Sequence, residues 1–248
     1  MVLQLLERTA DLIAWRWIDF CITNFGVDFV TGCKIRKMPS LERIGSAYGG
    51  WTIPTHLLGE SSICYCAGVG EDISFDMGLI ERYNCEVYAF DPTPRAKLHV
   101  RRHAQQQERF HFMDLGLWDR DEAAKFFAPT NPDHVSHSIL NLQKTDTYFT
   151  SECNRLSTIM KKYGHSKLAL LKLDIEGAEY RVIDSVIEDE LSIDIICVEY
   201  DEAYNNLDKK YVQRIRQSAL KLCKYNYEVV AIDQRCNYTF VKSNFICY

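Results

Sequence analysis

From Ser62 onward, short apolar segments alternate with segments whose apolar residues recur at helical spacing. The apolar segments are hydrophobic along nearly their whole length, which is typical of parallel strands covered by helices on both faces. We therefore predict an α/β fold with a doubly wound, mostly parallel seven-stranded sheet that ends in an antiparallel pair. The expected strands are Ile63–Cys66, Val87–Phe90, Arg109–Met113, Leu168–Leu173, Ile193–Val198, Tyr227–Ile232 and Tyr238–Val241.

The connecting segments predict helices over Ile73–Tyr83, from Pro94 to about Gln106, over Ser157–Tyr163, after Glu179, and over Tyr211–Leu222. One stretch breaks this alternation. A short strand is expected at residues 125–127, and a polar, proline-containing loop at residues 129–146. Long loops inside compact domains are often functional, so this loop is a candidate wall of a site.

The chain is expected to divide into an N-terminal helical extension, residues 1–60, and an α/β domain, residues 61–248. Residues 1–25 predict an amphipathic helix that packs on the domain or on a partner subunit, which makes a homodimer reasonable. Charged residues interrupt every apolar run before it reaches the ~18 residues of a membrane span. The segment also lacks the basic start of a secretory signal. Contact with a membrane surface is the alternative.

The composition excludes some partners. A formal net charge of −5 argues against binding to the phosphate backbone of nucleic acids. The ten cysteines are scattered and show no Cys-x-x-Cys spacing, so we expect buried free thiols in a reducing compartment and a cytoplasmic protein.

The segment Leu170–Glu179, LLKLDIEGAE, carries the strongest chemical signal. A buried strand ends in Asp174, and Glu176 and Glu179 follow within one turn of the expected helix. Clustered carboxylates repel one another and resist burial, so a site that handles a cation or a proton explains them well. Favourable charge at a helix N-terminus is the alternative, and it accounts for one or two of the three acids.

A glycine loop, Gly68-Val69-Gly70, follows the first expected strand. Glycines allow a sharp turn and a close approach of the backbone to a ligand, although a purely structural turn would use them too. Glu71 and Asp72 come next, and the third glycine of a dinucleotide fingerprint is missing. Because acids at a helix start repel a pyrophosphate, the loop suits a cationic or neutral ligand better than a nicotinamide dinucleotide.

Asp91 ends the second expected strand, where an acid can accept hydrogen bonds from ribose hydroxyls. Its alternative role is to cap the helix behind Pro92. Taken with the glycine loop and the acids of Leu170–Glu179, Asp91 indicates a nucleoside cofactor that has a positive charge and no phosphates. S-adenosylmethionine fits this description.

These segments resemble the FkbM-type family of class I S-adenosylmethionine-dependent methyltransferases, which have a Rossmann-like fold. The similarity extends from about Tyr48 to Val241, and the segment Leu170–Glu179 is its most specific part. Two further segments, residues 48–51 and 135–138, are typical of a bacterial branch of that family. The other matching segments are residues 69–76, 87–94 and 116–119.

The chain departs from the pattern of class I methyltransferases at one position, and the resemblance implies a set of cofactor contacts. Class I methyltransferases usually carry an acid two residues before the first loop glycine, and Cys66 stands there in this chain. Glu71 and Asp72 are our candidates to bind the amino-acid end of the cofactor instead. The full set of implied cofactor-binding residues is Gly68, Val69, Gly70, Glu71, Asp72, Asp91, Pro92, Gly116, Leu117 and Asp174.

The resemblance also implies O-methylation of a hydroxyl on a sugar, a glycan or a related natural product. A hydroxyl is a weak nucleophile until a base takes its proton. Our candidate catalytic residues are Asp174, Glu176 and His137. Asp174 and Glu176 also have the chemistry to bind a divalent cation, although none is expected. Candidates for acceptor contacts are Tyr48, Trp51, His134 and Glu199.

Two other functions stay open from the sequence. Because Cys66 replaces the usual acid, the chain is compatible with a non-catalytic module that binds S-adenosylmethionine or S-adenosylhomocysteine as a sensor or assembly partner. The less favoured alternative is a nicotinamide-dependent oxidoreductase on a similar sheet. The sequence does not distinguish among the possible methyl acceptors.

Overall fold

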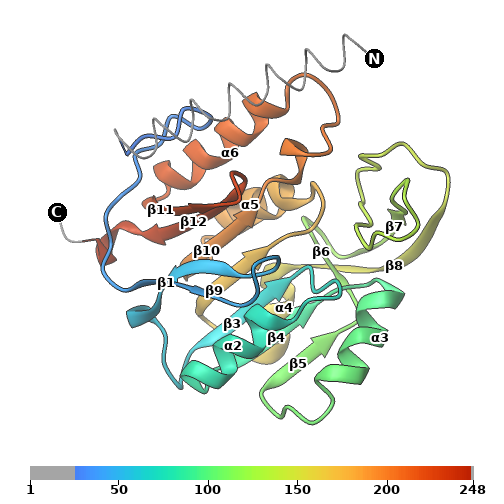
Figure 1. The fold of residues 1–248 in the computed structure, drawn as a ribbon, viewed down its shortest axis with the longest axis horizontal. Helices are drawn as coiled ribbons and strands as arrows, with labels where there is room; N and C mark the ends of the chain where they lie inside the picture. Colours follow the sequence, from blue (N-terminus) through green and yellow to red (C-terminus); the bar gives the residue numbers. More distant parts are fainter. Residues whose placement is uncertain (1–25, 247–248) are drawn as a thin grey trace.

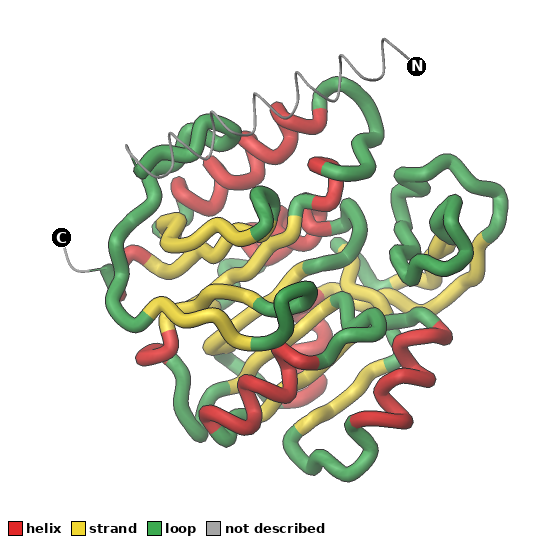
Figure 2. Tube along the Cα trace, in the orientation of Figure 1, coloured by secondary structure: helices red, strands yellow, loops and turns green. Residues whose placement is uncertain are grey.

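The structure is a computed structural model that describes residues 26–246 (Figures 1 and 2). Its main sheet has seven strands in the order β11-β12-β10-β9-β3-β4-β5. Strand β12 is antiparallel to both of its neighbours, and the other pairs are parallel. The predicted fold class is therefore confirmed. The strands are β3 (Ile63–Ala67), β4 (Glu86–Phe90), β5 (Phe110–Met113), β9 (Leu168–Leu173), β10 (Ile193–Glu199), β11 (Tyr227–Asp233) and β12 (Asn237–Lys242).

A hydrophobic core lies on each face of this sheet. Along β3, Cys64 and Cys66 point into one core and Tyr65 and Ala67 into the other, because side chains alternate along a strand. The first core includes apolar residues of helices α2 and α3, which lie in front of the sheet in Figure 1. The second includes residues of α4, α5 and α6. These helices are α2 (Ser74–Tyr83), α3 (Pro94–His103), α4 (Leu156–Tyr163), α5 (Glu179–Glu188) and α6 (Tyr211–Lys224).

Residues 26–60 form strands and loops rather than helices over most of their length. They contain the antiparallel pair β1 (Leu41–Ile44) and β2 (Trp51–Pro54), followed by the short 3-10 helix η1 (Thr55–Leu57). Trp51 packs in the same core as Val230 and Val241, so this hairpin helps to cover the end of the sheet that α2 and α3 leave open. The helix predicted within residues 1–25, and the dimer contact assigned to it, lie outside the described residues.

A second, smaller sheet with the order β6-β8-β7 follows β5 in the chain. Its strands are β6 (Gly116–Trp118), β7 (Glu122–Phe127) and β8 (Tyr148–Arg155). The predicted strand at residues 125–127 is the last part of β7, whereas β6 and β8 were not predicted. Residues 128–147 form the expected loop between β7 and β8, and this sheet stands to the right of the main sheet in Figure 1.

No helix within residues 26–246 combines the length and the apolar character needed to cross a membrane. This result covers only the described part of the chain.

The glycine loop begins at the end of β3, next to the end of β9. Gly68 has a φ of 82°, and its amide donates to the carbonyl of Phe90 at 3.0 Å. A Cβ atom at Gly68 would stand 1.7 Å from the carbonyl oxygen of Asp174. Only glycine therefore allows the ends of β3 and β9 to approach as closely as they do.

We expect Gly68→Ala to lower the free energy of unfolding by at least about 2 kcal/mol, because the methyl group clashes with backbone and the left-handed φ disfavours alanine. Chemical denaturation measures the change. Gly59→Ala is the matched control, since a Cβ there meets nothing within 4 Å. A Gly68→Ala protein as stable as this control would contradict the close contact.

Candidate functional site

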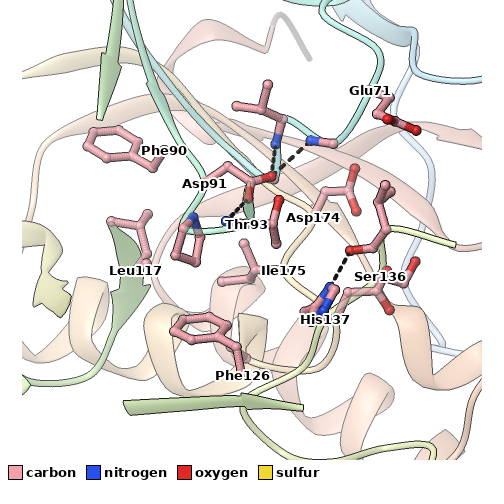
Figure 3. A pocket seen from close by; sticks show the side chains of 18 of the residues that line it. Glu71, Phe90, Asp91, Thr93, Leu117, Phe126, Ser136, His137, Asp174 and Ile175 are labelled. Atoms are coloured by element: carbon pink, nitrogen blue, oxygen red, sulfur yellow. Dashed lines mark hydrogen bonds between the residues drawn. The ribbon is translucent and has the colours of Figure 1, made fainter. Parts of the chain in front are cut away.

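A cavity lies at the carboxyl ends of β3, β4 and β9, with about 840 Å³ of empty space that is partly open to solvent (Figure 3). The loop between β7 and β8 forms its opposite wall through Val135, Ser136, His137 and Ile139. The residues predicted from the sequence that line this cavity are Tyr48, Gly68, Val69, Gly70, Glu71, Asp72, Asp91, Pro92, Gly116, Leu117, His137, Asp174 and Glu176.

Three residues predicted to contact the acceptor do not line this cavity. Trp51 is 1% exposed and belongs to the hydrophobic core instead. His134 is exposed on the loop, and its carbonyl accepts from Arg95. Glu199, at the end of β10, lies close to the cavity-lining Asp174, so it borders the site through that acid.

Asp91 holds the glycine loop. One carboxylate oxygen, Oδ2, accepts from the amides of Val69 at 3.0 Å and Gly70 at 2.9 Å, and Oδ1 accepts from the amide of Thr93 at 2.8 Å (Figure 3). The side-chain cap of α3 is Thr93, which accepts from the amide of Ala96. Asp91 thus fixes the loop, and Oδ1 keeps acceptor capacity for a ribose hydroxyl.

Glu71 and Asp72 line the cavity, and each has protein partners. Glu71 pairs with Arg95 at 2.6 Å. Asp72 accepts from the hydroxyl of Ser46 at 2.5 Å and from the amide of Ser74 at 2.8 Å, which ties the β1–β2 hairpin to the start of α2. Their predicted contact with the amino-acid end of the cofactor remains a prediction.

A buried acid from α2 stands beside Cys66, where the sequence lacks the usual acid. Asp76 is 3% exposed and lies close to the thiol of Cys66. Its Oδ1 atom is buried and has no hydrogen-bond partner among residues 26–246. Burial raises the pKa of Asp76 to about 6, against the attraction of Lys172. A signal was present in the sequence, because Asp76 shares a helix face with the buried Leu79 and Ile80.

Lys172 supplies a buried positive charge between the glycine loop and the acids. Its ammonium donates to the carbonyl of Gly68 at 2.6 Å and pairs with Asp174 at 3.0 Å. Burial opposes the charge, but the attraction of Asp174 and Asp76 outweighs it and raises the pKa of Lys172. The sequence showed this residue as the one charge within the apolar run of β9, and we had not assigned it a role.

The carboxyl ends of β9 and β10 bring five acids together: Asp174, Glu176, Glu179, Glu199 and Asp201. Burial raises the pKa of Glu176 to about 7 and those of Glu179 and Glu199 to about 8, and the neighbouring acids reinforce each shift. Burial and repulsion by Glu176 likewise raise the pKa of Asp201. Asp201 comes from the turn after β10, and its place here was not visible in the sequence.

The backbone at Glu176 is strained. Its φ of 55° lies in the left-handed region, which a residue with a side chain seldom occupies. The amide of Glu176 donates to Asp201 at 2.9 Å, and its carbonyl accepts from the hydroxyl of Ser138 at 2.6 Å. Strain that the surroundings hold in place is a common property of functional sites.

His137 lies on the loop wall of the cavity, opposite Asp174 (Figure 3). Its Nδ1 atom is 2.9 Å from the carbonyl oxygen of Val135, and its ring packs edge-on against Phe149. Because a carbonyl only accepts, Nδ1 carries the proton and Nε2 of the neutral ring is an acceptor. The structure thus orients His137 as a potential base.

The remaining lining is largely apolar. Leu117 and Phe126 from the smaller sheet line the cavity, and Ile139 and Ile175, which also line it, pack against the cluster that contains Phe126. Apolar walls beside Asp91 suit an adenine ring next to a ribose, and the acids suit a sulfonium and an ammonium group. The donor set of this cavity therefore fits S-adenosylmethionine.

The sheet order and the cavity at the carboxyl ends of its strands agree with the class I methyltransferase fold predicted from the sequence, and the cavity has the chemistry to bind S-adenosylmethionine. Residues 67–229 match the model of the methyltransferase FkbM domain. Because this match covers well over half of the chain, the protein belongs to the FkbM methyltransferase family. The assignment sets aside the nicotinamide-dependent oxidoreductase.

Individual relatives are distant. Methyltransferase-like protein 24 of Rattus norvegicus is 28% identical over 124 residues, which are 50% of this chain and 28% of that protein. The match thus spans less than a third of that relative. The SAH-bound methyltransferase of Podospora anserina is 10% identical with a TM-score of 0.42, covering 73% of this chain and 71% of that one. Aeropyrum pernix fibrillarin with S-adenosylmethionine is 10% identical with a TM-score of 0.40, covering 76% and 68%.

We expect Asp91→Ala to weaken the binding of S-adenosylmethionine at least about tenfold, because the glycine loop loses its anchor and the ribose its acceptor. Each amide left unpaired also costs about 1–3 kcal/mol of folding free energy. Titration calorimetry on folded protein gives the affinity, with the exposed Glu108→Ala as control. Unchanged affinity would rule out the assignment of Asp91 to the cofactor.

The raised pKa of Asp76 predicts how stability changes with pH. Between its ordinary value near 4 and about 6, Asp76 binds a proton in the folded but not in the unfolded protein, so stability falls as the pH rises. Relative to Asp76→Asn, the wild-type protein should lose up to about 3 kcal/mol across this window. Urea denaturation at a series of pH values measures the difference, with the exposed Asp146→Asn as control. A difference that does not vary with pH would contradict the burial of an ionisable Asp76.

Proposed function

We propose that this methyltransferase transfers its methyl group to a hydroxyl on a sugar, a glycan or a related natural product. One observation carries the proposal: the cavity that holds the glycine loop is also lined by His137, with Nε2 as an acceptor, and by the acids Asp174 and Glu176. A hydroxyl needs such a base because it is a weak nucleophile while it keeps its proton.

When bound, S-adenosylmethionine supplies an electrophilic methyl group on a positively charged sulfur. The tasks of the protein are to align the acceptor oxygen with that carbon and to receive the hydroxyl proton. Gly68, Gly70 and Asp91 would hold this cofactor, and it would supply both the methyl group and the sulfur that keeps the electron pair as leaving group. The hydroxyl proton would pass to Nε2 of His137, which lines the same cavity as Asp174 and Glu176.

The charge of the cavity supports a neutral, hydroxyl-rich acceptor. Glu71, Asp72, Asp174 and Glu176 all line it, and such a surface repels the phosphates of a nucleic acid. Carboxylates are good acceptors for hydroxyl groups, and the exposed Tyr48 at the edge of the cavity offers a ring on which a sugar can stack.

The primary test is an acceptor screen with methyl-labelled S-adenosylmethionine against free sugars, glycans and hydroxylated natural products. We expect label in a product whose new methyl group is on oxygen. Tight cofactor binding without turnover on any acceptor would favour the non-catalytic module, which the replacement of the usual acid by Cys66 first suggested.

With an active acceptor, His137→Asn should lower kcat about 10²- to 10⁴-fold and leave the affinity for S-adenosylmethionine nearly unchanged, because the variant removes a base and not a cofactor contact. Steady-state kinetics and calorimetry separate the two effects. His103→Asn at the exposed end of α3 is the control. Full activity of His137→Asn would move the role of base to Glu176 or Asp174.

A further inference from the structure

Three acids at the carboxyl ends of β9 and β10 lie in an arrangement suited to a metal ion. Asp174, Glu199 and Asp201 each offer an oxygen atom, and these atoms lie within 4.8 Å of one another. The pairing of Leu173 with Val198 places Asp174 beside Glu199, and Asp201 follows two residues later. Two neighbouring strands and the turn after one of them therefore build the group.

A fourth acid, Glu179, lies behind this group, against Asp201. Its side chain is buried, and the residue is 0% exposed. Its Oε1 atom accepts from the amide of Ile175 at 2.8 Å, but its buried Oε2 atom has no hydrogen-bond partner in the described part of the chain. A buried carboxylate oxygen without a partner is costly, so its presence beside three further carboxylates indicates a missing positive group.

The protein charges known to act here do not balance the acids. Lys172 is the cation that pairs with Asp174, and its ammonium also serves the carbonyl of Gly68. The charges that act most strongly on Asp201 all come from acids, namely Asp174, Glu176, Glu179 and Glu199. Burying several carboxylates beside one ammonium is unfavourable unless they keep protons or a further positive charge joins them.

We propose that Asp174, Glu199 and Asp201 bind one divalent cation of the hard, oxygen-seeking type, with Mg²⁺ as the physiological ion. Three carboxylate oxygens on a partly open wall suit Mg²⁺, which keeps several of its water ligands. This assignment replaces the sequence-based pair of Asp174 and Glu176, because Glu176 is not part of the group. The carboxylate of Glu179 then lies behind the ligand Asp201.

The position of the site suggests its use, and this use rests on the proposed O-methylation. Asp174 lines the cavity, so the ion would lie on the cavity wall, opposite His137. A divalent cation lowers the pKa of an oxygen bound to it, so an acceptor hydroxyl held there gives up its proton more readily. The proton leaves to His137 or to water, and the ion itself is unchanged.

The test measures binding of Mn²⁺ to the chelator-treated, full-length protein by electron paramagnetic resonance, with neither cofactor nor acceptor present. We expect saturable binding of about one ion, which Mg²⁺ displaces. Glu199→Gln and Asp201→Asn should each weaken it at least about tenfold, and the exposed Glu108→Gln should not. Circular dichroism checks that each variant is folded.

A second measurement guards against loss of structure in one variant. Mg²⁺ should raise the unfolding temperature of the wild-type protein and of Glu108→Gln, but not that of Glu199→Gln, because an ion that binds only the folded state stabilises it. The proposal is overturned if the wild-type protein takes up no ion, or if the folded variants bind it as well as wild type. A failed acceptor screen with intact Mn²⁺ binding would remove the O-methylation and leave the metal site standing.

Discussion

The buried ammonium of Lys172 is the interaction on which the site depends. It is 5% exposed, and it joins the carbonyl of Gly68 to the carboxylate of Asp174 at the point where β3 and β9 end. An ammonium in this position would cost several kcal/mol if it were alone. Asp174 on one side and Asp76 on the other offset that cost. The glycine loop and Asp174 are therefore positioned by the same charge.

The other wall of the cavity depends on a different constraint. The smaller sheet carries the loop from β7 to β8, and Ser138 in that loop binds the carbonyl of the strained Glu176. This bond and the one from the Glu176 amide to Asp201 fix the backbone between β9 and α5. The strain and the crowded carboxylates both oppose stability, so a binding role is the simplest reason for a protein to keep them.

Much of the architecture was predictable because the main strands are apolar along their length and the helices between them are amphipathic. Strands β6 and β8 were missed for a physical reason. Most of β8 is partly exposed and includes Ser151, Glu152 and Asn154, so its composition is that of a loop. Its strand conformation comes from pairing with β6 and β7. Strand β6 is distant from β8 in the chain, and β7 has only a weak strand pattern in its sequence.

The site was predictable to the extent that residues sit next to strand ends. The glycine loop, Asp91 and Asp174 met in one cavity because parallel strands end at the same edge. Trp51 did not, because an aromatic residue beside glycines looks the same whether it stacks on a ligand or fills a core. Asp91 proved to be bonded to three backbone amides, a role that no spacing rule distinguishes from ribose binding.

The sequence by itself determined the α/β class, the edge of the sheet at which ligands bind, and the family, because these depend on local periodicity and on short motifs. Only the tertiary structure decided which charges meet. Asp76 reaches Cys66, Lys172 lies between Gly68 and Asp174, and Asp201 joins Asp174 and Glu199, although these residues are far apart in the chain or lie in unremarkable turns. Electrostatic contacts depend on distance and burial in space, and neither quantity can be read from spacing along a chain.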